Sequence, residues 1–275
     1  MAKKRLDILL VEKGFAPTRH KAQALIMSGE ILIVDKTADK AGSMFEESVE
    51  IRIRGNRSRY VSRGGDKLEG ALKKFELSVD GLTVLDTGAS TGGFTDCLLQ
   101  NGASNVYAVD VGYGQIDMKL RNDPRVKIYE KINIKEIPED FFGMHFDLIT
   151  VDVSFISLLK VFPALYALLA PHGAILALVK PQFEAGRDRI GKGGVVRDPV
   201  IHENIVNEVI DGAEKLSLYA EKATFSSLPG PKGNIEFFVL FKKNKSFKVN
   251  LDIKSIVSEA QTLTKRQNQT VGQSP

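Results

Sequence analysis

The stretch that most constrains the fold is residues 84–94, Val-Leu-Asp-Thr-Gly-Ala-Ser-Thr-Gly-Gly-Phe. It predicts a buried strand at residues 82–85, then an acid, a glycine-rich turn and a helix at 93–101. A second apolar strand, at 106–109, ends in Asp110, 24 residues after Asp86. This spacing is typical of a Rossmann-like nucleoside site, where an acid after the second strand binds the ribose hydroxyls of an adenosine.

The glycine-rich turn indicates which ligand such a site would take. Residues 88–93, Gly-Ala-Ser-Thr-Gly-Gly, depart from G-x-G-x-x-G at its third position, and no Gly-Lys-Ser/Thr follows. These departures exclude a dinucleotide fingerprint and a P-loop. Asp86 would repel a pyrophosphate and favours a cationic ligand such as S-adenosylmethionine. We expect Gly88, Gly92 and Gly93 to let the backbone approach that ligand; a turn that binds nothing is the alternative.

Strands and helices alternate from residue 82 to residue 242. Further strands are expected at 126–129, 148–151, 174–179, 220–226 and 236–241, and further helices at 66–75, 115–120, 157–169 and 199–216. The pattern predicts an α/β fold with a mostly parallel sheet covered on both faces. With an antiparallel hairpin from the last two of its seven strands, this is the plan of a Rossmann-like class I methyltransferase.

Residues 1–60 are predicted to form a separate α+β module. A first helix carries Leu6, Leu9 and Leu10, Thr18 caps a second that ends at Gly29, and short strands follow at 31–34 and 49–53. The segments Arg5-Leu-Asp and Thr18-Arg-His-Lys-Ala-Gln-Ala-Leu-Ile-Met-Ser-Gly29, followed by Val34, resemble the S4 RNA-binding domain. That resemblance implies RNA phosphate contacts by Arg5, Arg19, Lys21 and Lys40. A basic helix pair without an RNA partner is the alternative.

The charge distribution also indicates RNA binding by the N-terminal part. Residues 1–65 hold 13 Lys and Arg against 8 Asp and Glu, whereas the rest hold 25 against 26. Five arginines, at 52, 54, 57, 59 and 63, fall within twelve residues beside the nucleoside site, and the last four lie in a Gly/Arg/Ser-rich connection at 54–65. We expect Arg57, Arg59 and Arg63 to bind phosphate, with a solvated charge cluster as the alternative. A catalytic domain at 61–245 and a polar, partly helical or frayed tail at 246–275 complete the expected organisation.

Four charged residues are predicted to meet near the carboxyl ends of the strands, where parallel α/β sheets place ligands. Asp152 ends the strand at 148–151, Lys180 ends the strand at 174–179, Glu236 opens the last strand, and Lys67 lies in the preceding helix. A lysine at the end of a wholly apolar strand needs a partner, and Asp152 and Glu236 are the candidates. Structural ion pairs are the alternative to a catalytic site.

Six motifs together resemble the TlyA family, rRNA 2′-O-ribose methyltransferases once called hemolysins, in which an S4 domain precedes an FtsJ-like catalytic domain. They are Ser62-Arg-Gly-Gly-Asp-Lys-Leu68, Asp86-Thr-Gly-Ala-Ser-Thr-Gly-Gly-Phe94, Asp110-Val-Gly-Tyr-Gly-Gln115, Asp152-Val-Ser-Phe155, Val179-Lys-Pro-Gln-Phe-Glu184 and Gly233-Asn-Ile-Glu236. The resemblance implies an S-adenosylmethionine-dependent enzyme acting on ribosomal RNA, and a catalytic tetrad of Lys67, Asp152, Lys180 and Glu236.

The tetrad suits a ribose hydroxyl, which is a poor nucleophile and must be oriented and relieved of its proton. Because a methyl group on a sulfonium is already activated, much of the catalysis can be in-line positioning. Lys180 is expected to face the hydroxyl, either as a base or as an orienting group. A second cation, Lys67, would favour the neutral form of Lys180, and the two carboxylates would oppose it.

The remaining expectations concern the cofactor and the loop after Lys180. Asp86, the glycine-rich turn (Gly88, Ser90, Thr91, Gly92, Gly93 and Phe94), Asp110 and Asn133 are expected to bind S-adenosylmethionine. In this set Asn133 stands where FtsJ-like enzymes usually have an acid, next to the adenine. The basic, glycine-rich residues 184–197 are expected to form an RNA-facing lid or an ordinary surface loop.

Other functions fit the sequence less well. Amino-group methyltransferases commonly carry Asn/Asp-Pro-Pro-Tyr where this chain has Asp152-Val-Ser-Phe155, and Cys97, the one cysteine, is expected to be a buried apolar residue. We expect no metal, no membrane segment and a reducing, cytoplasmic setting. A non-catalytic RNA-binding or ribosome-assembly factor and a membrane-lytic hemolysin are the rival functions.

Overall fold

The computed structural model describes residues 3–33, 36–49, 51–53, 59–186, 189–191, 193–230 and 232–271. The chain separates into two compact units, Met1–Arg57 and Ser58–Pro275. Each unit has its own hydrophobic core, and each is described by itself below.

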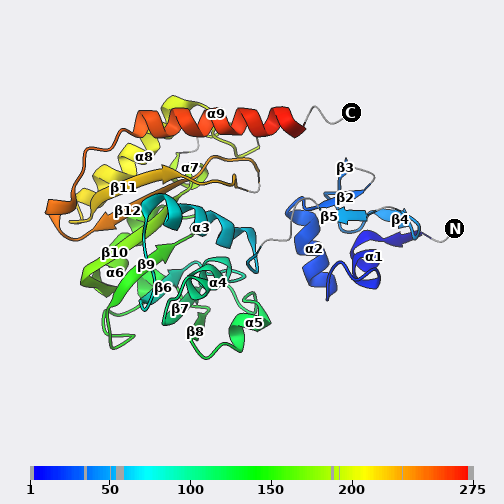
Figure 1. Ribbon diagram of the computed structural model, residues 1–275, viewed down its shortest axis with the longest axis horizontal. Helices are drawn as coiled ribbons and strands as arrows, with labels where there is room; N and C mark the ends of the chain where they lie inside the picture. Colours follow the sequence, from blue (N-terminus) through cyan, green and yellow to red (C-terminus); the bar gives the residue numbers. More distant parts are fainter. Residues whose placement is uncertain are drawn as a thin grey trace. The chain divides into compact units, whose positions relative to one another are not determined.

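The N-terminal unit packs two helices against short antiparallel strands (Figure 1). Thr18 caps the second helix, because its hydroxyl accepts a hydrogen bond from the Lys21 amide at 3.2 Å. Gly29 follows that helix at a φ of +72°, which a glycine adopts without strain. The elements are β1 (Lys3–Arg5), α1 (Leu6–Glu12), α2 (Arg19–Met27), β2 (Ile31–Ile33), β3 (Lys36–Thr37), β4 (Met44–Glu46) and β5 (Ile51–Ile53).

The second unit is built on a seven-stranded sheet, as predicted, with the strand order β11-β12-β10-β9-β6-β7-β8. Only β12 runs antiparallel to its neighbours, and it pairs with both β10 and β11. The strands are β6 (Thr83–Thr87), β7 (Asn105–Asp110), β8 (Val126–Glu130), β9 (Phe146–Val151), β10 (Leu169–Val179), β11 (Tyr219–Phe225) and β12 (Phe237–Lys242).

Helices cover both faces of this sheet (Figure 1). On one face, α3 (Arg63–Phe75), α4 (Gly93–Gln100) and α5 (Met118–Arg121) bury apolar side chains with β6, β7 and β12. On the other face lie α6 (Phe162–Leu168), α8 (Pro199–Glu214) and α9 (Ile253–Val271). Short helices, which lie in the connections, are η1 (Ile134–Glu136), η2 (Leu158–Lys160), α7 (Pro181–Glu184) and η4 (Lys245–Phe247).

Two elements differ from the sequence-based expectation. The helix expected at 157–169 is divided into η2 and α6, with β10 starting at Leu169 and changing register before Ala174. The C-terminal stretch, expected to be a polar, partly helical or frayed tail, contains the long helix α9. Ile253, Val257 and Ala260 on α9 are buried in the core of the unit, so this helix is part of the sheet-containing unit.

Candidate active site

The four residues of the predicted tetrad meet at one edge of the sheet. Asp152 follows β9 and Lys180 follows β10, so both lie at the carboxyl ends of parallel strands. Glu236 precedes β12, whose antiparallel direction brings its start to the same edge, with Phe237 opposite Val179. Lys67 reaches this edge from α3.

Within the tetrad the side chains form two ion pairs. Lys67 Nζ lies 2.6 Å from Glu236 Oε2, and Lys180 Nζ lies 2.5 Å from Asp152 Oδ1. Both lysine side chains are about one-tenth exposed, at 10% and 11%. Buried ammonium groups require a partner of this kind, because removal from water disfavours the charge. The pairing therefore keeps two cations at the carboxyl edge of the sheet, each with a carboxylate partner.

Three residues that sequence reasoning missed complete the surroundings of the tetrad. Ser154 Oγ accepts a hydrogen bond from Lys180 Nζ at 3.0 Å, and Gln182 Nε2 donates to Glu236 Oε1 at 3.1 Å. Gly230 leaves room for the same carboxylate, since an added Cβ would lie 2.5 Å from Glu236 Oε1. The signal was available for two of them: Ser154 and Gln182 are polar residues two positions after Asp152 and Lys180.

The glycine-rich turn is tied to Asp110 by a hydrogen bond from a backbone amide. The Ser90 amide donates to Asp110 Oδ2 at 2.8 Å, and the Gly112 amide donates to Oδ1 at 2.6 Å. Ser90 takes a φ of +50°, which is uncommon for a residue with a side chain. Asp110 thus holds the turns after β6 and β7 together at the carboxyl edge.

The three glycines of the turn are needed for close contacts within the protein, and their expected contact with the cofactor stays a prediction. A Cβ at Gly88 would lie 2.6 Å from the Asp152 carbonyl oxygen, and one at Gly92 would lie 2.2 Å from Leu120 Cδ1. At Gly93 it would lie 2.2 Å from Ser62 Oγ. The absence of a Cβ therefore allows the turn to pack against β9, α5 and the start of α3.

Asp86 and Phe94, both expected to contact the cofactor, point inward. Asp86 is fully buried and accepts hydrogen bonds from the hydroxyls of Thr95, at 2.6 Å, and Thr150, at 3.0 Å. Burial, reinforced by the nearby Asp152, raises the pKa of Asp86 to about 6, although the two hydroxyls oppose the shift. The Phe94 ring is buried against Phe238 at 6.1 Å between centroids. These positions favour roles in holding the turn.

Two further residues of the predicted cofactor set lie in half-buried positions at the same edge. Thr91 accepts a hydrogen bond from the Asp117 amide through its carbonyl oxygen, at 3.2 Å. Asn133 precedes η1, where its Oδ1 accepts from the Lys135 amide at 3.3 Å and its Nδ2 donates to Glu136 Oε1 at 2.6 Å. Asn133 thus caps this turn after β8.

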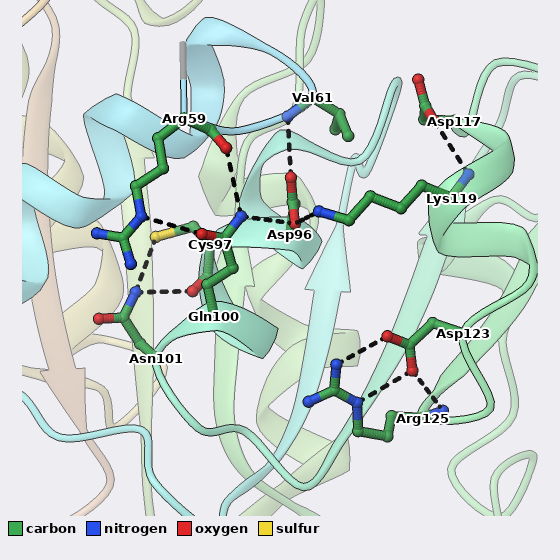
Figure 2. A network of polar contacts seen from close by, with 10 residues as sticks. All are labelled: Arg59, Val61, Asp96, Cys97, Gln100, Asn101, Asp117, Lys119, Asp123 and Arg125. Atoms are coloured by element: carbon green, nitrogen blue, oxygen red, sulfur yellow. Dashed lines mark hydrogen bonds and ion pairs between the residues drawn. The ribbon is translucent and has the colours of Figure 1, made fainter.

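A polar network fastens the turn's helix to its neighbours. Figure 2 shows Asp96 of α4 accepting hydrogen bonds from the Val61 amide, Gln100 Nε2 and Lys119 Nζ, each at 3.0 Å. Arg59, expected to bind RNA, donates to Gln100 Oε1 at 3.0 Å. The network connects residues 59–61, α4 and α5, so it fixes the position of the helix that follows the glycine-rich turn.

The predicted RNA-binding residues lie in both units. Arg5 and Arg19 both donate to Asp7, a buried carboxylate whose pKa lies well below its ordinary range mainly because of Arg5. Lys21 lies in the first turn of α2, and Lys40 is exposed. In the second unit, the Arg63 guanidinium contacts the Pro229 carbonyl oxygen at 3.5 Å. Arg57 lies outside the described residues.

Within the described residues, no group of three or more His, Cys, Asp and Glu side chains is arranged to hold a metal ion. No helix in the described part of the chain is long and apolar enough to cross a membrane.

A seven-stranded sheet with one antiparallel strand next to its edge defines the class I methyltransferase fold that the sequence predicted. Residues 60–243 match the FtsJ-like methyltransferase family, and residues 4–51 match the S4 domain. The chain therefore belongs to the FtsJ-like methyltransferases and carries an S4 domain, which confirms the resemblance to the TlyA family.

Similar proteins and solved structures place the chain in the same family. The chain is 48% identical to "Putative rRNA methyltransferase YqxC" of Bacillus subtilis, over 86% of this chain and 85% of that protein. It is 42% identical to "16S/23S rRNA (cytidine-2'-O)-methyltransferase TlyA" of Mycobacterium tuberculosis, over 86% and 88%. A solved structure, "Putative hemolysin from Streptococcus thermophilus", matches with a TM-score of 0.78 and 42% identity, over 98% and 99%.

Proposed function

We propose that this protein transfers a methyl group from S-adenosylmethionine to the 2′-hydroxyl of a ribose in ribosomal RNA, with cytidine as the target nucleoside. The observation that carries the proposal is the convergence of Lys67, Asp152, Lys180 and Glu236 at the carboxyl edge of a methyltransferase sheet. The names of the relatives in Bacillus subtilis and Mycobacterium tuberculosis support ribosomal RNA as the substrate, and the latter supports the 2′-oxygen of cytidine.

The donor groups at this edge fit S-adenosylmethionine. Asp110 and Glu130 end β7 and β8, and Asp152 follows β9, so the edge presents carboxylates to a ligand that carries an amino group and a sulfonium. Asp110 is the residue we assign to the ribose hydroxyls, since its carboxylate is already oriented by the amides of Ser90 and Gly112. The turn at 88–93 would hold the methionine part, and Asn133 would lie near the adenine. When bound, this cofactor supplies an activated methyl carbon.

The chain's own residues must then orient the ribose hydroxyl. Lys180, which contacts both Asp152 and Ser154, is the tetrad residue that we assign to the ribose hydroxyl. In the proposed complex Lys180 donates a hydrogen bond to the 2′-oxygen, which is the orienting role rather than the base. Lys67 and Glu236 form the second pair, which adds a cation close to the oxygen that loses its proton.

The test is transfer of tritiated methyl groups to 30S and 50S subunits from a strain that lacks this gene. Wild-type protein should label one subunit or both at a ribose, shown by mass spectrometry of the nucleosides. Lys180→Ala should lower labelling at least 100-fold while binding S-adenosylmethionine with a Kd within about threefold of wild type. Binding of the cofactor by the wild type without any labelling would favour an RNA-binding factor that lacks turnover.

A further inference from the structure

Gln182 is a polar residue next to the tetrad that no part of the proposed reaction yet uses. It lies in α7, two residues after Lys180, and its Nε2 donates to Glu236 Oε1 at 3.1 Å. An ionised carboxylate only accepts hydrogen bonds, so this contact fixes the orientation of the amide, with the nitrogen toward Glu236. Gln182 follows Lys180 of one ion pair in the chain and contacts Glu236 of the other, so it connects the two pairs.

The oxygen at the other end of the same amide is unpartnered within the described residues. Gln182 Oε1 is buried, and no described residue donates a hydrogen bond to it. Buried polar atoms are nearly always hydrogen-bonded in folded proteins, and an exception beside a reactive site points to a ligand. The free group here is an acceptor, which suits a hydroxyl or amino donor and does not suit a phosphate or carbonyl oxygen.

The neighbouring side chains explain why an acceptor is useful at this point. Lys67 and Lys180 present N–H donors, and the carboxylates of Glu236 and Asp152 are paired with them. A ribose hydroxyl has one O–H donor, and its oxygen attacks through a lone pair. When an acceptor binds the O–H, the hydroxyl is held in one orientation. The lone pairs of its oxygen then point away from the acceptor, where a lysine can contact the oxygen.

We propose that Gln182 is a further residue of the methyl-transfer site, which holds Glu236 with its amide N–H and accepts a hydrogen bond from the acceptor ribose with its amide oxygen. This inference rests on the proposed function. A carboxamide is too weak a base to take the proton, so Gln182 orients the hydroxyl, and the proton is released to water as the methyl group moves from the sulfonium to the 2′-oxygen. With or without this contact, the reaction transfers a methyl group and gives the 2′-O-methylated ribose and S-adenosylhomocysteine.

The first test replaces the amide by an apolar group of similar volume. We expect Gln182→Met to lower the single-turnover rate of methyl transfer to ribosomal subunits at least tenfold, with the Kd for S-adenosylmethionine within twofold of wild type. The matched control is Gln261→Met in α9, which removes amide contacts to the Arg197 carbonyl oxygen and His202. The control variant should keep its rate within twofold of wild type.

The second test uses Gln182→Glu, which keeps the shape and the acceptor oxygen but places a carboxyl group against Glu236. Two adjacent carboxyl groups share a proton, which raises the apparent pKa of the pair. As pH falls from 8 to 6, the protonated carboxyl regains a donor, so the rate of Gln182→Glu relative to wild type should rise. A residue with only a packing role would give a constant ratio.

A double-mutant cycle with Glu236→Gln links the two residues. The loss of rate in Gln182→Met/Glu236→Gln should be at least threefold smaller than the product of the single losses. A rate for Gln182→Met above half of wild type, a pH-independent ratio for Gln182→Glu, or losses that multiply would each overturn the proposal.

The same variants separate this inference from the proposed function. Absence of labelling by wild-type protein on every subunit would overturn the proposed function and, with it, the contact to the ribose. The contact between Gln182 and Glu236 would then be tested by the Tm values of the two single variants and the double variant. A decrease in Tm for the double variant equal to the sum of the single decreases would show that the contact is absent.

Discussion

At the scale of single residues, the buried carboxylates of this protein are held in opposite ways. Asp86 accepts hydrogen bonds from two threonine hydroxyls, and burial raises its pKa to about 6. Asp7 accepts hydrogen bonds from two arginines and Gln23, which hold its pKa below the ordinary range. The direction of the shift depends on the partner, because burial alone penalises the charged form in both cases.

This contrast predicts a pH dependence of stability. Since the folded-state pKa of Asp86 lies above its ordinary 3.8, the folded protein binds this proton more tightly than the unfolded chain. The stability from protonated Asp86 is fully present below about pH 3.8 and is lost as pH rises through about 6, an effect of about 3 kcal/mol. The free energy of unfolding of wild type minus that of Asp86→Asn, from urea melts, should therefore fall between pH 4 and 7.

Asp7→Asn is the control with the opposite sign. The folded-state pKa of Asp7 is lowered, so its stabilising effect is present above the ordinary pKa and is lost only as pH falls below it. The difference between wild type and Asp7→Asn should stay constant from pH 5 to 7. A constant difference for Asp86→Asn over this range would contradict the predicted effect of burial.

At the scale of elements, α9 shows how much of the core depends on the end of the chain. Its sequence is polar overall, but Ile253, Val257 and Ala260 recur at helical spacing and are buried beside α8 and β11. Lys254 and Glu259 on the other side of the helix are exposed. A short apolar stripe of this kind, to which the half-buried Ile256 adds a fourth position, is easily missed in a polar segment.

We expect Val257→Ala to lower the free energy of unfolding of the sheet-containing unit by about 2 kcal/mol, since it removes two buried methyl groups and leaves a small cavity. Glu259→Ala, on the exposed side, should change it by less than about 0.5 kcal/mol. Urea unfolding of both variants tests this. Equal effects would mean that α9 does not pack on the core in solution.

At the scale of the whole molecule, most of the basic excess and the proposed tetrad fall in different units. Residues 1–57, the first unit, hold 11 Lys and Arg against 8 Asp and Glu, whereas the tetrad lies between residues 67 and 236 in the second unit. This division predicts that affinity for RNA and the rate of the chemical step can be changed separately. Phosphate contacts by the N-terminal unit would supply affinity, with little reading of sequence.

We expect Arg19→Ala/Lys21→Ala to weaken binding to ribosomal subunits and to make the slope of log Kobs against log salt concentration about 1.5 to 2 less steep. The single-turnover rate at saturating RNA should stay within about twofold of wild type. Lys254→Ala, which removes an exposed cation from α9, is the control and should leave the slope unchanged. A lower rate at saturation would show that these residues also affect the chemical step.

Much of the fold and the site could be predicted from the sequence because their signals are local. Alternating apolar strands and helices determined the seven-stranded sheet, and the residues that end or open strands identified Asp152, Lys180 and Glu236. The carboxyl edge of a parallel sheet collects such residues wherever they lie in the chain. Thr18 and Gly29 likewise marked the ends of α2 through capping and a positive φ.

Only the tertiary structure decided which side chains pair. Lys67 contacts Glu236 across 169 positions and Lys180 contacts Asp152 and Ser154, choices that depend on the direction of β12 and the position of α3. It also decided that the glycines at 88, 92 and 93 serve close packing within the protein. Contacts between distant segments depend on packed side chains and strand direction, and a local pattern of residues contains neither.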